Sequence, residues 1–181
     1  MRATEARALS LEFQGNAAYC FVMSDALYEQ DVLAWSEQQA DLLRRLARGE
    51  RVNDIDWAHV AEEIEDVGLS ELNAVQSYLR QMLVHLLKLR GWPELGAERH
   101  WRAEIVAFQA DASQRFSPSM RRRIALDKVY GRAVRQIDVT AYDGISAQYS
   151  PETCPVTLDQ LLNVSCAELE AAFREADSGG A

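Results

Sequence analysis

Hydrophobic residues recur at three- and four-residue steps through most of the chain, which is the spacing of α-helices. The first such segment extends from Asp31 to Arg48, and Gly49 stands where a left-handed helix cap is expected. Asp56 is a suitable N-cap for a second helix. Its predicted apolar face consists of Trp57, Val60, Ala61, Ile64 and Val67. Gly68 is expected to stop or bend this helix, and Ser70 to start the next one.

The clearest helical pattern lies between Ser70 and Arg90. One apolar stripe there is formed by Leu72, Val75, Leu79, Met82, Leu83, Leu86 and Leu89. Later helices are predicted over about Glu98–Phe116, Ser119–Tyr142, Thr157–Leu162 and Ser165–Ala176, the last opened by a capping box. No strand pattern of useful length is found. The sequence therefore predicts an all-α protein, an antiparallel helical bundle of about five main helices with short C-terminal helices.

The length of 181 residues suits one domain with an ordinary hydrophobic core. We expect residues 1–22 to be an N-terminal extension outside that core, because Met23-Ser24-Asp25 before a well-patterned helix is typical of a natural start. A secretory signal is not expected, since Glu5 and Glu12 interrupt any apolar segment there. The helical-bundle domain is predicted to cover residues 23–165. Residues 166–181 are predicted to form a C-terminal amphipathic helix with a frayed tail.

The charge and the cysteines narrow the class of protein. A formal net charge of −9 argues against general nucleic-acid binding, which needs a local basic excess. No apolar run approaches the roughly 18–20 residues that a membrane-spanning helix requires, so a soluble protein is expected. Cys20, Cys154 and Cys166 are widely separated and have no metal-ligand spacing. They fit a reducing cytoplasm.

An acidic segment is followed by an apolar helix that carries one histidine. Between Val52 and Leu79 there are seven acids and no Lys or Arg, and His85 follows within the apolar stretch. One interpretation is an ion-pair network in which Arg102 meets Glu62 or Glu63 beside the core. His85 by itself is expected to be a hydrogen-bonded residue at the border of its helix's apolar stripe. The alternative is a single-metal site formed by His59, Glu63 and His85, with His100 as another possible histidine ligand, if these side chains converge.

Two further groups of residues are candidates for binding. Arg102, His85 and Tyr130 together would form a pocket for an anionic ligand. The stretch 115–135 holds seven basic residues and one acid against the negative charge of the whole chain. Arg121, Arg122 and Arg123 are its candidates for contact with an acidic partner protein, and this stretch is also the one place where RNA binding is conceivable. The remaining interpretation is a solvated basic face beside the acidic helix.

Several short motifs together resemble an uncharacterised bacterial family, domain of unknown function twenty-nine. The resemblance covers residues 28–163. It rests on Tyr28-Glu29-Gln30-Asp31 with Trp35, Asp56-Trp57, Ala61-Glu62-Glu63-Ile64-Glu65 with Gly68, His85-Leu86-Leu87-Lys88, Trp101-Arg102 with Ile105, Ser117-Pro118-Ser119, Tyr130, and Pro151-Glu152-Thr153-Cys154-Pro155 leading into Leu158 and Leu161-Leu162. The resemblance implies an all-helical fold and a prokaryotic source, and it carries over no activity.

The sequence contains no serine-hydrolase elbow, P-loop, dinucleotide-binding glycine fingerprint or zinc-protease helix. We therefore expect a non-enzymatic cytoplasmic module that binds or regulates another protein, without a cofactor. The alternative is a metal-binding or metal-dependent bundle enzyme that uses one divalent transition metal. Membrane binding is not expected.

Overall fold

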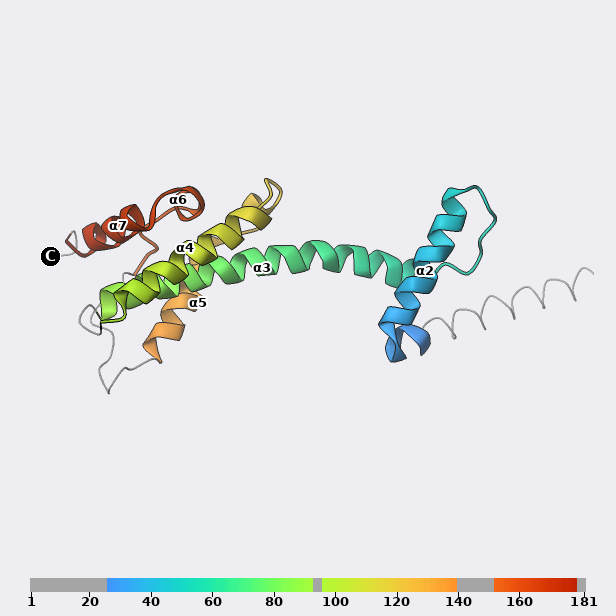
Figure 1. The fold of residues 1–181 in the computed structure, drawn as a ribbon, viewed down its shortest axis with the longest axis horizontal. Helices are drawn as coiled ribbons and strands as arrows, with labels where there is room; N and C mark the ends of the chain where they lie inside the picture. The colour runs from blue at the N-terminus through green and yellow to red at the C-terminus, as the bar shows by residue number, and fades with distance from the viewer. Residues whose placement is uncertain (1–25, 93–95, 140–151, 179–181) are drawn as a thin grey trace, which may run out of the picture. The chain divides into compact units, whose positions relative to one another are not determined.

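The structure is a computed structural model that describes residues 26–92, 96–139 and 152–178 (Figure 1). All regular structure in these ranges is helical: a turn over residues 26–30, then α2 (Val32–Ala47), α3 (Trp57–Gly91), α4 (Glu98–Arg115), a short 3-10 helix (Met120–Arg122), α5 (Leu126–Asp138), α6 (Leu158–Asn163) and α7 (Cys166–Ser178). The prediction of an all-α helical bundle is confirmed. None of the helices in the described ranges has the length and apolarity needed to cross a bilayer.

The chain divides into two compact units, Met1–Val67 and Gly68–Ala181, and α3 contributes to both. In the N-terminal unit the described part comprises the turn over residues 26–30, α2, a loop and the first turns of α3. The predicted extension over residues 1–22 lies outside the described residues.

Local signals set the ends of α2 as expected. Asp31 is the N-cap, and its carboxylate accepts a hydrogen bond of 3.0 Å from the backbone N–H of Ala34. Gly49 has a φ of +83°, the left-handed conformation that glycine adopts without steric cost, so the predicted helix cap is confirmed.

The predicted break at Gly68 is wrong. The segments expected as separate second and third helices form one helix of 35 residues, α3. Gly68 is exposed, and a Cβ added to it would meet no atom within 4 Å, so nothing in the fold requires a bend there. A single glycine inside a helix costs only about 1 kcal/mol relative to alanine, which is too little to end a helix with good helix formers on both sides.

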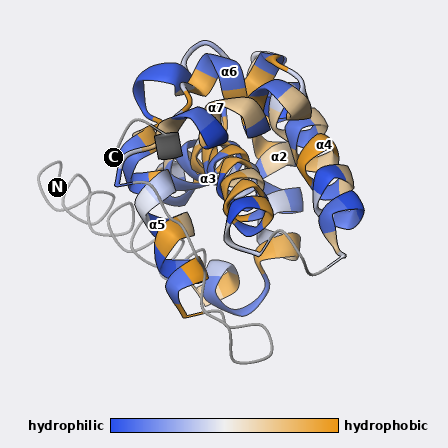
Figure 2. Ribbon diagram, turned by 90° about the vertical axis from the view of Figure 1, so that its left-hand side faces the viewer, coloured by the Kyte–Doolittle hydropathy of each residue, from blue (hydrophilic) through white to orange (hydrophobic). Residues whose placement is uncertain are grey.

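The core of the C-terminal unit is formed around the second half of α3. Leu79, Met82, Leu83 and Leu87 are fully buried there. Helix α4 runs antiparallel to α3, α5 lies along it on another side, and α6 and α7 pack on α4 (Figure 1). Figure 2 looks along α3 and shows its hydrophobic positions within the ring of these helices.

The fifth predicted helix begins later than expected. Only a 3-10 turn forms over Met120–Arg122, and Ala125 is extended with φ −84° and ψ 91°, so that α5 starts at Leu126. Ile124 is buried at this point, which places an apolar side chain in the core without helical continuity. The buried face of α5 consists of Val129, Tyr130, Ala133 and Ile137.

The two C-terminal helices start with capping boxes. Thr157 and Gln160 form one at α6, and Ser165 and Glu168 exchange the corresponding bonds at α7. Leu169 and Phe173 of α7 have no exposed surface and belong to the main hydrophobic cluster. The C-terminal helix, which the sequence analysis placed outside the bundle domain, is thus a part of its core.

His85 belongs to the core as well and is not a hydrogen-bonded residue at its border. Its side chain is 8% exposed and stacks on Phe108 of α4, with ring centroids 5.8 Å apart. Its Nδ1 atom is buried and has no hydrogen-bond partner among the described residues. Burial, followed by the nearby positive charge of Lys88, lowers the pKa of His85 to about 4.

The depressed pKa of His85 makes stability depend on pH in a defined window. The unfolded chain binds a proton at this residue near pH 6.5, whereas the folded chain binds it only near pH 4. The unfolded state holds more protons between these values, so the free energy of unfolding decreases as the pH falls through this window, by up to about 1.4 kcal/mol per pH unit. Urea denaturation of wild type and His85→Phe across this range should show the steeper loss in wild type. Parallel pH profiles for the two proteins would contradict the assignment.

Candidate functional site

The carboxylate of Asp56 is the centre of a buried polar cluster in the N-terminal unit. Its Oδ2 atom accepts hydrogen bonds from Trp35 Nε1 at 3.2 Å and from His59 Nδ1 at 2.7 Å. Its Oδ1 atom accepts a bond of 3.3 Å from the backbone N–H of His59, so that Asp56 caps α3 as predicted. The backbone N–H of Asp56 donates to Gln39 Oε1 at 2.9 Å. These bonds fasten the start of α3 to α2.

Tyr28 extends the cluster to the second turn of α3. Its ring stacks on His59, with centroids 4.0 Å apart and planes inclined by 24°, and meets Trp35 edge to face. Its hydroxyl donates to Glu63 Oε1 at 2.7 Å. This hydrogen bond, then burial, then the negative charge of Glu63 raise the pKa of Tyr28 to about 12. The phenol therefore stays protonated and acts as a donor.

The hydrogen bonds of this cluster hold Tyr28, α2 and the start of α3 in one fixed geometry. An ionised carboxylate only accepts hydrogen bonds, so the bond to Asp56 holds the proton of a neutral His59 on Nδ1. Both side-chain oxygens of Asp56 and the Oε1 atom of Glu63 are engaged by donors of the same unit. Buried polar groups that satisfy one another in this way specify one geometry for the elements that carry them.

The predicted metal ligands are not brought together. His59 pairs with Asp56 and Glu63 with Tyr28 in the N-terminal unit, whereas His85 stacks on Phe108 in the C-terminal unit. Across residues 26–92, 96–139 and 152–178, no group of three His, Cys, Asp or Glu side chains is placed to hold a metal ion. The proposed metal centre of His59, Glu63 and His85 is therefore wrong.

Arg102 pairs with a residue that the sequence analysis did not consider. Its Nε and one terminal nitrogen donate to the two carboxylate oxygens of Glu170 on α7, at 2.7 and 3.0 Å. The guanidinium in turn lowers the pKa of Glu170. The predicted bridge from Arg102 to Glu62 or Glu63 is therefore wrong, and Glu62 is an exposed residue of α3.

The predicted anion pocket of Arg102, His85 and Tyr130 does not form either. Arg102 lines a recess of about 200 Å³ together with the carboxylates of Glu98 and Glu170, and neither His85 nor Tyr130 reaches it. Tyr130 is 3% exposed and packs in the hydrophobic core. The lining holds three arginines, Arg90, Arg102 and Arg174, against two acids, and the guanidinium of Arg102 is already engaged by Glu170.

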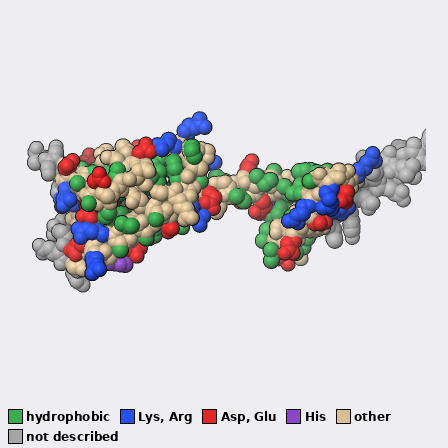
Figure 3. Space-filling view, turned by 45° about the horizontal axis from the view of Figure 1, so that its top comes forward, with side chains coloured by type: hydrophobic (Ala, Val, Ile, Leu, Met, Phe, Trp, Pro, Cys, Tyr) green, Lys and Arg blue, Asp and Glu red, His purple; other side chains and the backbone are tan. Residues whose placement is uncertain are grey.

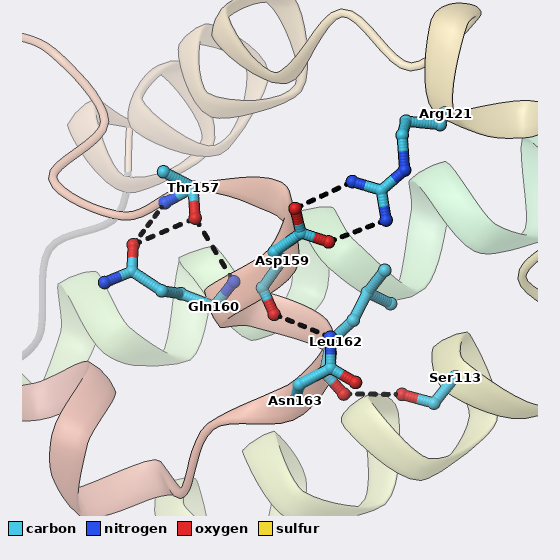
Figure 4. Close-up of polar contacts among 7 residues, drawn as sticks. All are labelled: Ser113, Arg121, Thr157, Asp159, Gln160, Leu162 and Asn163. Carbon is cyan, nitrogen blue, oxygen red and sulfur yellow. Dashed lines mark hydrogen bonds and ion pairs between the residues drawn. The ribbon is translucent and has the colours of Figure 1, made fainter. Parts of the chain in front are cut away.

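One arginine of the predicted basic patch already forms an ion pair within the protein. Arg121 forms a two-fold bond with Asp159 of α6, at 2.6 and 2.7 Å (Figure 4). The same short helix is held to α4 by the hydroxyl of Ser113, which donates to the backbone oxygen of Leu162 at 2.9 Å. Arg121 is thus part of the bundle's own contacts. Arg122 and Arg123 are exposed, and their binding of a partner stays a prediction.

The first turns of α3 also present an exposed apolar surface, which we call the α3 stripe: Trp57, Ala61, Ile64 and Val67. The exposed fractions are 60% for Trp57, 68% for Ile64 and 68% for Val67. The apolar pattern predicts that this face is buried, and that prediction is wrong. Of the larger residues on the predicted face, only Val60 is buried, at 8% exposure. In the space-filling view, hydrophobic and acidic side chains adjoin along this stretch of α3 (Figure 3).

Sequence reasoning did not find the partners of Asp56. Gln39 is the residue whose pattern carried a signal, because it is a polar side chain at a position of an otherwise apolar stripe, and it is 3% exposed. A buried amide requires a hydrogen-bond partner, which here is the backbone of Asp56. Trp35 stands one turn earlier on the same face and supplies the indole donor.

Removal of the Asp56 carboxylate should destabilise the N-terminal unit more than removal of an exposed cap. Asp56→Ala deletes a helix cap and leaves the buried Trp35 Nε1 without its acceptor, so we expect a loss of about 2–4 kcal/mol. Asp31→Ala is the matched control, because it removes the exposed N-cap of α2, at a cost of about 1 kcal/mol. Chemical denaturation followed by tryptophan fluorescence and far-ultraviolet circular dichroism measures both. Equal losses would show that the buried bonds to Asp56 contribute little.

Comparison with known proteins gives a family without an assigned activity. The family model described as "Domain of unknown function DUF29" matches residues 27–166. A crystal structure of an alpha-helical protein of unknown function from Rhodospirillum rubrum ATCC 11170 is similar, with 32% sequence identity and a TM-score of 0.57 over 82% of this chain and 96% of that one. No curated protein is significantly similar to the chain. Because the family model covers most of the chain, the protein belongs to the family of domain of unknown function 29.

Proposed function

We propose that the protein is a non-enzymatic module of the bacterial cytoplasm that binds another protein through the α3 stripe. The observation that carries the proposal is the exposure of Trp57, Ile64 and Val67 along one side of a single helix, with the exposed Ala61 between the first two. Scattered single apolar residues are common on protein surfaces, whereas neighbouring large ones are typical of interaction sites. From Trp57 to Val67 the stripe spans about 15 Å of helix axis, the length over which one partner helix makes contact.

The charge around the stripe indicates the chemistry of the partner. Glu62, Glu65 and Asp66 are exposed on the same turns, and no Lys or Arg occurs between Val52 and Leu79. A second copy of the chain, docked stripe to stripe, would place acids against acids, which is unfavourable. A helix with an apolar face bordered by Lys or Arg meets both the apolar stripe and its acidic borders. We therefore propose a basic amphipathic helix as the partner.

The cluster around Asp56 supports this function by holding the stripe in place. The residues that bond to α2 and to Tyr28 project from one side of α3, which leaves Trp57 and Ile64 outside the contact with α2. A surface on a fixed helix loses little conformational entropy when a partner binds.

The described thiols, Cys154 and Cys166, are free, and burial raises the pKa of each to about 11. Half-buried thiols that stay protonated have low reactivity. Free cysteines of this kind fit the reducing cytoplasm that we propose.

Trp57 gives a direct optical test of binding. It is 60% exposed, whereas Trp35, Trp92 and Trp101 are at most 4% exposed, so iodide should quench mainly the emission of Trp57. A designed helical peptide with a leucine face bordered by lysines should protect Trp57 from quenching. The same peptide with glutamates in place of the lysines should bind at least about tenfold more weakly.

Matched variants separate the stripe from general hydrophobic adhesion. Ile64→Glu should abolish peptide binding without unfolding the protein, because Ile64 is 68% exposed. Val106→Glu is the control, since Val106 is an exposed apolar residue of α4, at 54%. Binding that Val106→Glu weakens as much as Ile64→Glu contradicts the proposal. A dimer of the wild-type chain that Ile64→Glu dissociates in sedimentation experiments would show that a second copy occupies the stripe.

A further inference from the structure

A second recess, distinct from the α3 stripe, lies between α3 and α5 in the C-terminal unit. It has a volume of about 210 Å³ and is lined by Asn73, Gln76, Ser77 and Arg80 of α3 and by Val129 and Arg132 of α5. Its polar lining consists of two guanidinium groups, two amides and one hydroxyl, without a carboxylate. All these polar side chains have N–H or O–H groups to donate, and the two arginines only donate.

The two arginines of this recess differ from three other arginines of the C-terminal unit. Arg102, Arg115 and Arg121 are each bonded to a carboxylate of another segment, namely Glu170, Glu71 and Asp159. Within the described ranges, Arg80 and Arg132 form no ion pair. The Nε atom of Arg80 is buried and has no hydrogen-bond partner among the residues that the structure describes. A buried donor without an acceptor is costly, which makes an acceptor from outside the chain favourable.

We propose that this recess binds the phosphate group of a small molecule, with Arg80 and Arg132 as its principal ligands. Guanidinium groups match the oxygen geometry of phosphate and form short charge-assisted hydrogen bonds with it. The bound anion would pair with both guanidinium groups and relieve the repulsion between two like charges that line one recess. The amides of Asn73 and Gln76 and the hydroxyl of Ser77 supply further donors to the remaining oxygens.

The size of the recess favours a small ligand. Its volume of about 210 Å³ is below the roughly 300–1,000 Å³ that is usual for pockets of drug-sized ligands. The formal net charge of −9 disfavours the extended backbone of a nucleic acid. Inorganic phosphate and a short phosphate monoester share the chemistry that this lining recognises.

Isothermal titration calorimetry with inorganic phosphate and with glycerol 3-phosphate, at constant ionic strength, tests the assignment. Wild type should bind at least one of the two saturably, and the tighter of them shows whether the natural group is free or esterified. Arg132→Gln should weaken binding at least about tenfold, the loss expected of one charge-assisted hydrogen bond. It should remain folded, because Arg132 is exposed. Arg80→Lys keeps the charge but lacks the Nε donor, so it should weaken binding as well.

Arg135→Gln is the matched control, since Arg135 is an exposed arginine of the same helix that does not line the recess. It should bind phosphate as wild type does. The proposal is overturned if neither anion binds wild type saturably, or if Arg135→Gln loses as much affinity as Arg132→Gln. Ile64→Glu should leave phosphate binding unchanged, so failure of the proposed partner site and failure of this inference are separate results.

Discussion

The structure depends on one helix whose surroundings change along its length. In the C-terminal part of α3, Leu79, Met82 and Leu83 have no exposed surface, because other helices of that unit cover them. In its first turns the helix packs on α2 through Val60 and the polar cluster, while Ile64 and Val67 are two-thirds exposed. The same helical periodicity therefore forms a core in one place and a surface in the other. Stability and the proposed partner binding come from one continuous element.

The N-terminal unit compensates for a small apolar interior with buried hydrogen bonds. Its described residues bury three hydrophobic side chains, Trp35, Leu42 and Val60, together with the polar Gln39 and Asp56. A carboxylate removed from water must be bonded on all sides to be tolerated. The indole of Trp35 and the ring and backbone of His59 meet this requirement, which fixes how α2 meets the beginning of α3. Specific geometry is what such networks contribute where hydrophobic burial is limited.

The fold was more accessible from the sequence than the site, and particular residues show why. The extent of α4, the caps at Asp56 and Gly49 and the box at Ser165 depend on neighbours within a few positions, and local chemistry predicts them. The predicted break at Gly68 was wrong because the low helix propensity of one glycine costs little free energy, which the rest of the helix outweighs. The face of Trp57 and Ile64 looked like core because periodicity shows that a helix has an apolar side and not whether another element covers it.

The partners of the charged residues were beyond sequence reasoning for a related reason. Arg102 lies 68 positions from Glu170 and Arg121 lies 38 from Asp159, so only the packing of α4, α6 and α7 decides that they meet. Once these ion pairs are assigned, the arginines that have no such pair become the candidates for binding a ligand. An arginine bonded to a carboxylate of its own chain has little left to offer an anion, as Arg102 shows with its two bonds to Glu170. Arg80 and Arg132 share a recess that contains donors and no acid, and the chain supplies them no counter-ion in its described part. The electrostatic balance of the fold thus distinguishes arginines that hold the bundle together from arginines placed to bind a ligand.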